Sequence, residues 1–477
     1  MKRLSALLAA LALAGCTMIP HYEAPVPPVP ETFPGATAEA AGELPAAATL
    51  VWSDFLVDPK LRAVVEQALA GNRDLRMASL NVDRVAALYR VQRAAITPAF
   101  GVQASASRSR IPEQVTDSGE AEIAEQAAVD LGFLSWEIDL FGRLRSLSAS
   151  AFEQYLATAE GERAARSALI AATAGSYLRL AADSESLSLA EATIEAQRNA
   201  LDLIRSTRDA GIGSDLEVRQ AESQVEQARV SRAQVAGALA VDRHALELLL
   251  GGPLAAELEP TGFASIAATA EIASGLSSEV LLGRPDILAA EHRLRAANAN
   301  IGAARAAFFP RISLTAALGT MAPELSSLFE SGTRSWTFAP VVQVPLFAGG
   351  GPRAQLKAIK IEREMAVAEY EKAIQAGFSE VADALALGET LAAQREAQDA
   401  LVVALEETLR LSEQRFRSGI DGYLGVLVAQ QALYRAQQSS VDLRLVERAN
   451  RIQLYKALGG GWSPGDGTAT PAPESTP

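Results

Sequence analysis

The residues that imply a chemical step lie at the N-terminus, in MKRLSALLAALALAGC. A basic start precedes an apolar stretch from Leu4 to Ala14, which is too short to span a bilayer and is typical of an export signal. Cys16 is the only cysteine, so its thiol has no disulfide partner. The preceding LAG favours diacylglyceryl transfer to that thiol and cleavage of residues 1–15 as a signal peptide. A plain cleaved signal with an incidental cysteine is the alternative.

Other reactive constellations are missing from the sequence. The patterns GxSxG, HExxH, GxxxxGK[ST] and CxxC do not occur, and His21, His244 and His292 lie far apart along the chain. The glycine runs at 348–353 and 459–462 lack the Lys-Ser/Thr of a phosphate loop, so they predict a strand-to-helix corner and a helix stop. We therefore expect no enzyme activity, no cofactor and no metal site.

Composition limits the fold and the partners. The 477 residues are 49% apolar but only 5% aromatic, which favours thin, closely packed helices. The net charge of −14, without a basic patch, argues against a nucleic-acid partner. Residues 16–50 are rich in proline and alanine and predict an extended leader behind the lipid anchor, whereas residues 460–477 predict a flexible tail.

Internal repeats define the elements that follow the leader. Residues 74–98 match 286–310 at an offset of 212, and residues 210–228 match 418–436 at an offset of 208. The protein therefore contains two structural repeats, which we assign to residues 51–252 and 253–459.

Each repeat contains one predicted strand hairpin. Side chains alternate with period two after Pro98 and again after Pro310, which predicts hairpins at 99–141 and 310–347. In the first, the polar, acidic stretch from Pro112 to Glu125 is the predicted loop, and the second arm alternates through Leu140. In the second, Val342, Val344 and Leu346 are expected on one strand face. The length of their arms is close to the ~9–11 residues that a tilted strand needs to cross a bilayer. Four strands cannot close a barrel, so membrane hairpins require an oligomer, in which two copies would supply about 8 strands and three about 12. A soluble sandwich hairpin is the alternative.

Long helices follow each hairpin. Apolar and small residues recur at alternating spacings of three and four, and an arm from 143 to 209 would extend roughly 100 Å. The breaks at Gly211 and Gly213, and at Gly419 and Gly422, predict helical turns in which glycine adopts positive φ. A coiled-coil scaffold is the alternative that the helices alone leave open.

Three blocks, at 283–320, 346–386 and 454–462, resemble the TolC-like outer-membrane factor family, and most closely its OprM-like lipoprotein branch. The resemblance implies a mixed α and β membrane protein, a homotrimer whose 12-strand β-barrel in the outer membrane continues as a long periplasmic α-helical barrel. It implies the passive exit duct of a tripartite efflux pump for drugs and other small molecules. Its partners would be a periplasmic adaptor (membrane fusion protein) and an inner-membrane RND-type transporter. The exit duct of a type I protein secretion system and a lipid-anchored scaffold remain alternatives.

The resemblance also implies roles for residues at both turns. The adaptor would dock at the tips near 211 and 419, on Arg208, Gly211, Ile212, Arg415, Gly419 and Ile420. The gated aperture would involve Asp215, Leu216, Glu217, Tyr423 and Leu424. Relatives often carry an aspartate where this chain has Val428, which puts a second ring of aspartates in doubt. Carboxylates at 215 and 217 would favour cations, although they could instead serve only to favour a helix N-terminus.

Overall fold

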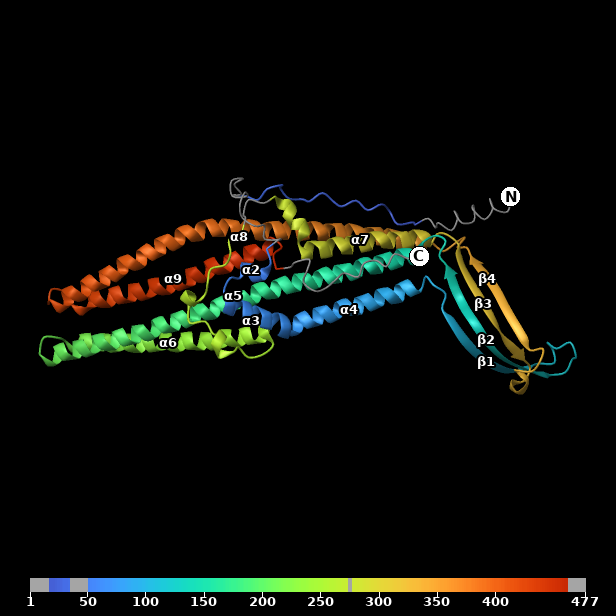
Figure 1. Ribbon diagram of the computed structural model, residues 1–477, viewed down its shortest axis with the longest axis horizontal. Coiled ribbons are helices and arrows are strands. Elements are labelled where there is room, and N and C mark those ends of the chain that lie inside the picture. The colour runs from blue at the N-terminus through green and yellow to red at the C-terminus, as the bar shows by residue number, and fades with distance from the viewer. Residues whose placement is uncertain (1–16, 35–49, 273–276, 462–477) are drawn as a thin grey trace. The chain divides into compact units, whose positions relative to one another are not determined.

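The computed structural model of the chain describes residues 17–34, 50–272 and 277–461, so the predicted signal peptide and Cys16 lie outside it. Short 3-10 helices occupy Ala256–Leu258, Phe263–Ser265, Ser278–Gly283 and Leu325–Ser327. The main elements in Figure 1 are α2 (Trp52–Phe55), α3 (Pro59–Gly71), α4 (Arg73–Ala94), β1 (Phe100–Ile111), β2 (Glu122–Ile138), α5 (Arg143–Asp209), α6 (Asp215–Leu250), α7 (Pro285–Ala306), β3 (Arg311–Ala322), β4 (Arg334–Gln343), α8 (Gly351–Arg417) and α9 (Tyr423–Ala457).

The chain divides into two compact units. The first contains the sheet with the adjoining parts of α4, α5, α7 and α8, and the second contains α2, α3, α6, α9 and the remaining lengths of the long helices. Each unit draws segments from both sequence repeats, because the two repeats lie beside each other in both units.

The sheet of the first unit is antiparallel, in the order β1-β2-β3-β4 (Figure 1). The pairing of β2 with β3 joins the two repeats, and it brings backbones close at two glycines. A Cβ on Gly132 would lie 2.1 Å from Ala316 O, and one on Gly319 would lie 2.1 Å from Val129 O. Within the described residues, β1 and β4 are each paired on one edge only.

The first hairpin differs from the prediction at both ends of β2. The acidic residues from Glu122 to Glu125, predicted as loop, begin the strand, because Glu125 lies opposite Arg108 and pairs with it at 2.8 Å. The register then shifts between Phe133 and Trp136, with Ser135 at φ 55°. This bulge breaks the predicted alternation through residue 140.

The second hairpin is shorter than predicted. Strand β4 ends at Gln343, so Val344 and Leu346, which were expected on one strand face, lie beyond it. Pro345 follows, and a proline cannot donate a backbone hydrogen bond to a ladder. The chain then turns at Gly349 and Gly350, which have φ values of 57° and 83°, and enters α8 as the predicted corner.

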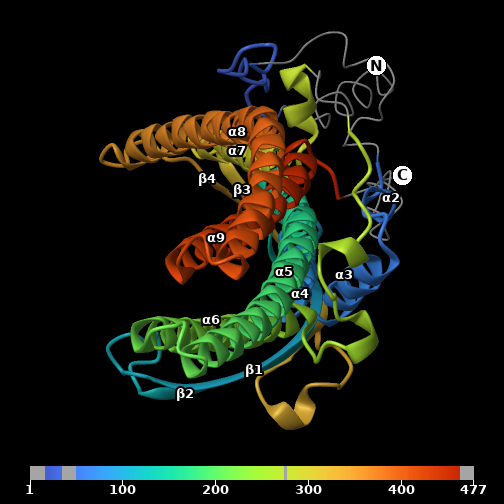
Figure 2. The same ribbon diagram turned by 90° about the vertical axis from the view of Figure 1, so that its left-hand side faces the viewer.

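Helices α5 and α8 each contain 67 residues, or about 100 Å of α-helix. Figures 1 and 2 show α6 running back along α5 and α9 running back along α8. The predicted seams are buried in the second unit at Ala190, Ile194, Gln197, Leu201 and Ile204 of α5, at Val218, Ala221, Val225, Ala228 and Leu246 of α6, and at Val426, Ala429 and Ala436 of α9. No helix in the described part of the chain is long and apolar enough to cross a membrane.

Candidate functional site

The turns between α5 and α6 and between α8 and α9 have the same backbone geometry. In the first, Gly211 N–H donates to the carbonyl of Arg208 at 2.9 Å, and Ile212 N–H donates to that of Thr207 at 3.0 Å. In the second, Gly419 and Ile420 make the same two bonds, at 2.9 and 3.0 Å, to carbonyls that also lie 208 residues further along. Gly211 and Gly419 have φ values of 78° and 72°, where a Cβ would be strained.

The second glycine of each turn has a different role from the one predicted. Neither Gly213 nor Gly422 is among the positive-φ glycines. A Cβ on Gly213 would lie 3.0 Å from the backbone nitrogen of Arg208, so glycine there permits close approach of the chain. Gly422 is extended at φ −77° and is the N-cap residue of α9.

One arginine bridges each turn to an acidic residue on its far side. Arg208 Nη1 lies 3.2 Å from Asp215 Oδ1, and Arg415 Nη2 lies 3.2 Å from Asp421 Oδ1. The hydrogen bond from Arg415 lowers the pKa of Asp421, and its reciprocal raises the pKa of Arg415. The arginines are not at equivalent positions, because Phe416 is the counterpart of Arg208. The sequence interpretation missed Asp421, although its place one residue before Gly422 was a signal.

Apolar side chains are exposed at equivalent positions of the two turns. Ile212 and Ile420 are 84% and 62% exposed, and Leu216 and Leu424 are 67% and 59% exposed. Each pair is again separated by 208 residues. The two turns therefore present matching apolar groups, which is typical of surfaces covered in an assembly.

Tyr423, which was predicted for the aperture, is buried in the single chain. Its side chain is 1% exposed and packs in a cluster formed by α5, α6 and α9, so in the single chain it is part of the core. Phe416 contacts it with ring centroids 5.6 Å apart. We name this group the tip cluster; it comprises Leu201, Ile204, Val218, Ala221, Val225, Tyr423, Val426 and Leu427.

Glu217 and Asp215 have separate roles in the structure. The carboxylate of Glu217 accepts from the backbone N–H of Ser214 at 2.9 Å, while Ser214 Oγ accepts from the Glu217 N–H. This is a capping box, so Glu217 stabilises the start of its own helix. Asp215 is exposed and is held by Arg208. Of the two predicted aperture carboxylates, Asp215 is thus the one that is not used as a cap.

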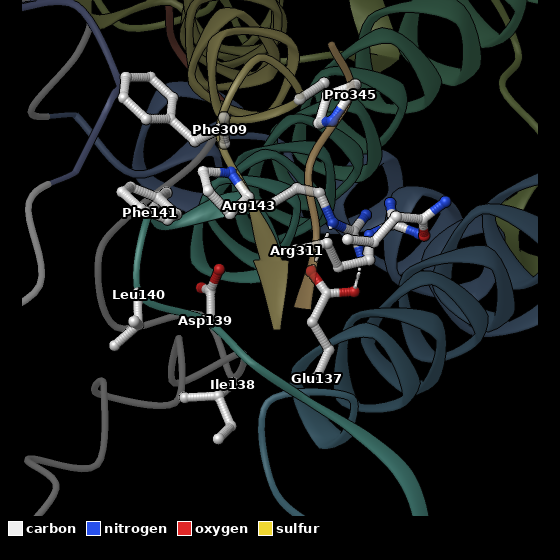
Figure 3. A pocket seen from close by; sticks show the side chains of 13 residues that line it. Glu137, Ile138, Asp139, Leu140, Phe141, Arg143, Phe309, Arg311 and Pro345 are labelled. Carbon is white, nitrogen blue, oxygen red and sulfur yellow. Dashed lines mark hydrogen bonds and ion pairs between the residues drawn. The ribbon is translucent and has the colours of Figure 1, made fainter. Parts of the chain in front are cut away.

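A second polar site lies in the first unit, where the sheet meets the helices (Figure 3). Arg143 makes two hydrogen bonds to Glu137, at 2.8 and 2.7 Å, and Arg311 Nε lies 3.5 Å from the same carboxylate. Beside them, the rings of Phe141 and Phe309 stack at 4.8 Å. The cavity that they line has a volume of about 220 Å³. These contacts connect the end of β2 with the starts of α5 and β3.

The first described residues of the leader are bound along α7 in the same unit. Arg305 Nη1 donates to the Met18 carbonyl at 3.2 Å, and Asn298 Nδ2 donates to the Pro20 carbonyl at 3.0 Å. A Cβ on Gly302 would clash with Ile19, so glycine makes room for the leader. Met18 and Pro20 are thus bound to the C-terminal half of α7, the helix that precedes β3.

Comparison with known proteins assigns the chain to a family. A family model described as outer membrane efflux protein matches residues 64–252 and 276–460. The chain is 44% identical over 460 residues to the solvent efflux pump outer membrane protein SrpC of Pseudomonas putida, covering 96% of this chain and 98% of that one. It is 42% identical over 462 residues to the outer membrane protein OprJ of Pseudomonas aeruginosa, covering 97% and 96%.

A solved structure shows the same fold. The open state of the Neisseria gonorrhoeae MtrE outer membrane channel superposes with a TM-score of 0.85 at 37% identity, over 94% of this chain and 98% of that one. The chain belongs to the outer membrane efflux protein family. The predicted fold class and the prediction of an outer-membrane efflux channel are confirmed, and the secretion duct and the scaffold gain no support.

Proposed function

We propose that the chain acts as a homotrimeric exit duct whose closed end is formed by the two helical turns. The observation that carries this proposal is the pair of equivalent turns, each bridged by an arginine and an acid and each exposing apolar residues. In a trimer, six such turns would meet around one axis. Asp215 and Leu216, together with Leu424, would line the aperture, and opening would require the turns to separate.

The number of copies follows from the sheet. An unpaired strand edge in lipid leaves backbone groups unsatisfied at several kcal/mol each, so the edges of β1 and β4 must pair with other copies. Three chains would supply 12 strands, enough for a barrel with a water-filled lumen, whereas two would supply only about 8.

The exposed tip residues support docking of a periplasmic adaptor. Ile212 and Ile420, next to the bridged arginines, would contact the adaptor, which would connect the duct to an inner-membrane RND-type transporter. Energy and chemical work would come from that transporter, so the duct itself would be no enzyme. By analogy with relatives named as solvent and antibiotic efflux proteins, the transported molecules would be drugs and other small apolar compounds.

The leader contacts support anchoring through Cys16. Because Arg305 and Asn298 hold Met18 and Pro20 against the C-terminal half of α7, which leads into β3, an acylated Cys16 would enter the outer membrane near the sheet. Intact-mass spectrometry of the membrane-extracted protein should show the added acyl mass, and Cys16→Ser should lack it. A wild-type chain without acyl mass would rule the anchor out.

The proposal as a whole is tested by purifying the full-length protein from outer membranes. We expect a detergent-stable, heat-modifiable trimer that shows cation-selective, mostly closed conductance in planar bilayers. Asp215→Asn should lower the cation preference, while Glu217→Gln should leave it nearly unchanged because glutamine can also form the capping box. A monomer without conductance would overturn the proposal.

A further inference from the structure

A polar cavity separates α9 from α5 and α6 in the second unit, next to the tip cluster. Its volume is about 470 Å³. It contains glutamines from all three helices and no carboxylate among its lining residues. Its one charged lining residue is Arg435 of α9, and the hydrogen-bonding residues used below are Gln197 of α5, Gln224 of α6, and Gln430 and Gln431 of α9.

Two amide pairs cross this cavity and connect the two helical hairpins. Gln197 Nε2 donates to Gln430 Oε1 at 3.1 Å. On the other side, Gln431 Nε2 donates to Gln224 Oε1 at 2.8 Å. A carboxamide can donate and accept, so either member of such a pair can exchange its partner for another amide, a hydroxyl or water.

The network is incomplete in this conformation. The side chain of Gln197 is only 5% exposed, yet within the described residues its Oε1 has no hydrogen-bond partner. A buried acceptor without a donor is unfavourable. The arrangement therefore does not fix α9 against α5 in the way that a fully satisfied network or a close-packed apolar seam does.

Polar groups recur at each turn of the three helices. Residues three or four apart share a helix face. If α9 slid along its axis by one turn, each polar side chain on α5 or α6 would therefore lose one hydrogen-bonding partner on α9 and meet the next one. The polar positions follow this spacing at 193 and 197 on α5, at 224, 227 and 231 on α6, and at 430, 434 and 438 on α9. Meanwhile Gln398 of α8 donates to the Ala436 carbonyl at 2.8 Å, which couples α8 to α9.

We propose that the pairs Gln197–Gln430 and Gln224–Gln431 form a slip layer through which the α8–α9 hairpin moves against α5 and α6 when the duct opens. These glutamines are positioning residues for the aperture and do not contact it. The inference rests on the proposed gating at the tips. The new element is that the energy barrier to opening depends on the two glutamine pairs, which lie next to the tip cluster on the side away from the turns.

Two kinds of substitution test the slip layer in the full-length protein, one expected to lower the open probability and one expected to raise it. Gln197→Leu with Gln430→Leu should replace exchangeable amides by an apolar contact that resists sliding. In the background of Arg208→Ala with Arg415→Ala, which the proposed gating predicts to open the tip, this pair should lower the open probability at least about tenfold in planar bilayers. Arg435 also lines the cavity and would attract introduced carboxylates, so Gln197→Glu with Gln430→Glu is made together with Arg435→Gln. This variant should raise the open probability at pH 8 relative to Arg435→Gln alone, because like charges repel, and less so at pH 4.5.

Matched controls lie on the same helices outside the cavity. Gln234 on α6 and Gln453 on α9 are exposed, so Gln234→Leu and Gln453→Leu should leave the open probability unchanged. If the first leucine pair fails to assemble into trimers, Gln224→Leu with Gln431→Leu provides the same test on the other side of the cavity.

The outcomes separate the two proposals. If Arg208→Ala with Arg415→Ala opens the channel, but adding a leucine pair changes the open probability no more than the control substitutions do, the slip layer is wrong. The proposed gate at the turns is then unaffected. If Arg208→Ala with Arg415→Ala does not open the channel, the proposed gate at the turns is wrong, and the slip layer, which rests on it, is wrong as well. Opposite effects of the leucine and glutamate pairs would support the slip layer, because a purely structural role would shift both in the same direction.

Discussion

Arg415 and Asp421 face each other across the turn between α8 and α9, with Nη2 and Oδ1 3.2 Å apart. Arg208 and Asp215, at positions that are not equivalent in the repeat, make a similar contact across the other turn, also at 3.2 Å. All four side chains are substantially exposed, so each pair contributes little to global stability. Their effect is local, because each pair holds one chain reversal in shape.

The burial of Tyr423 predicts opposite results for two substitutions. Its hydroxyl is buried and has no partner within the described residues, and burial raises the pKa of the phenol to about 12. Tyr423→Phe removes only that unpaired hydroxyl, so stability should be unchanged or increased. Tyr423→Ala leaves a cavity in the tip cluster and should cost about 3–5 kcal/mol locally.

Hydrogen exchange of the amides at 201–225 and 423–427 measures both Tyr423 variants. Protection there should fall for the alanine variant and persist for the phenylalanine variant. Equal loss of protection in both variants would show that the hydroxyl is needed, contrary to the structure.

The capping box predicts that Glu217 tolerates glutamine but not alanine. Glutamine can still accept from the Ser214 N–H, whereas Glu217→Ala removes that acceptor and should destabilise the first turn of α6 by about 0.5–2 kcal/mol. Exchange rates of the amides at 214–218 check this. Glu226→Ala, further along the same helix, is the control and should leave these rates unchanged.

Asp183 predicts a pH dependence of stability. Burial, together with a hydrogen bond and repulsion from Asp242, raises the pKa of Asp183 to about 7. The unfolded chain loses this proton near 3.8, so the folded state loses stability as the pH rises from 3.8 to about 7 and little more above that. Asp183→Asn should therefore raise the melting temperature at pH 8 and change it little at pH 4.

Melting followed by circular dichroism at the two pH values measures the effect of Asp183→Asn. Asp202→Asn on the exposed side of α5 is the matched control and should not produce the same pH difference. A stabilisation by Asp183→Asn that is equal at pH 4 and pH 8 would contradict the raised pKa.

Arg284 predicts that a buried cation holds three chain segments together. Its side chain is 5% exposed and bonds to Asp286, Glu380 and the carbonyl of Ala457. Arg284→Lys should cost about 2 kcal/mol of unfolding free energy, because an ammonium cannot reproduce this planar fork. Urea unfolding measures it. Arg410→Ala, which breaks an exposed pair with Glu407, should have nearly no effect, and equal losses in the two variants would refute the assignment.

The sequence predicts the helical hairpins and turns well because the repeat at offset 208 is preserved in backbone geometry. Gly211 and Gly419 both lie at the chain reversals. A glycine that interrupts a helical pattern predicts such a turn, because glycine adopts positive φ without strain. The bulge at Ser135 carried no such signal, since serine is not typical of that conformation. The start of β2 was missed because Glu125 reads as loop until its strand partner, Arg108, is known.

The candidate site was predicted less completely. The family resemblance implied Tyr423 as an aperture residue, whereas its side chain is buried in the single chain. Asp421 was missed because its function depends on Arg415, six residues earlier across a turn. The spacing pattern placed Gln197 in the helix seam, but it did not predict that Gln197 hydrogen-bonds to Gln430, because it does not identify the partner helix.

The central claim is that the two arginine-bridged turns hold the duct closed, and single-channel recording tests it most directly. Full-length wild type, Arg208→Ala with Arg415→Ala, and the control Arg410→Ala would be recorded in planar bilayers. Six weak contacts would act together in a trimer, so we predict a mostly closed wild type and control and a double variant whose open probability is at least about tenfold higher. A double variant that conducts no more than Arg410→Ala would contradict the account.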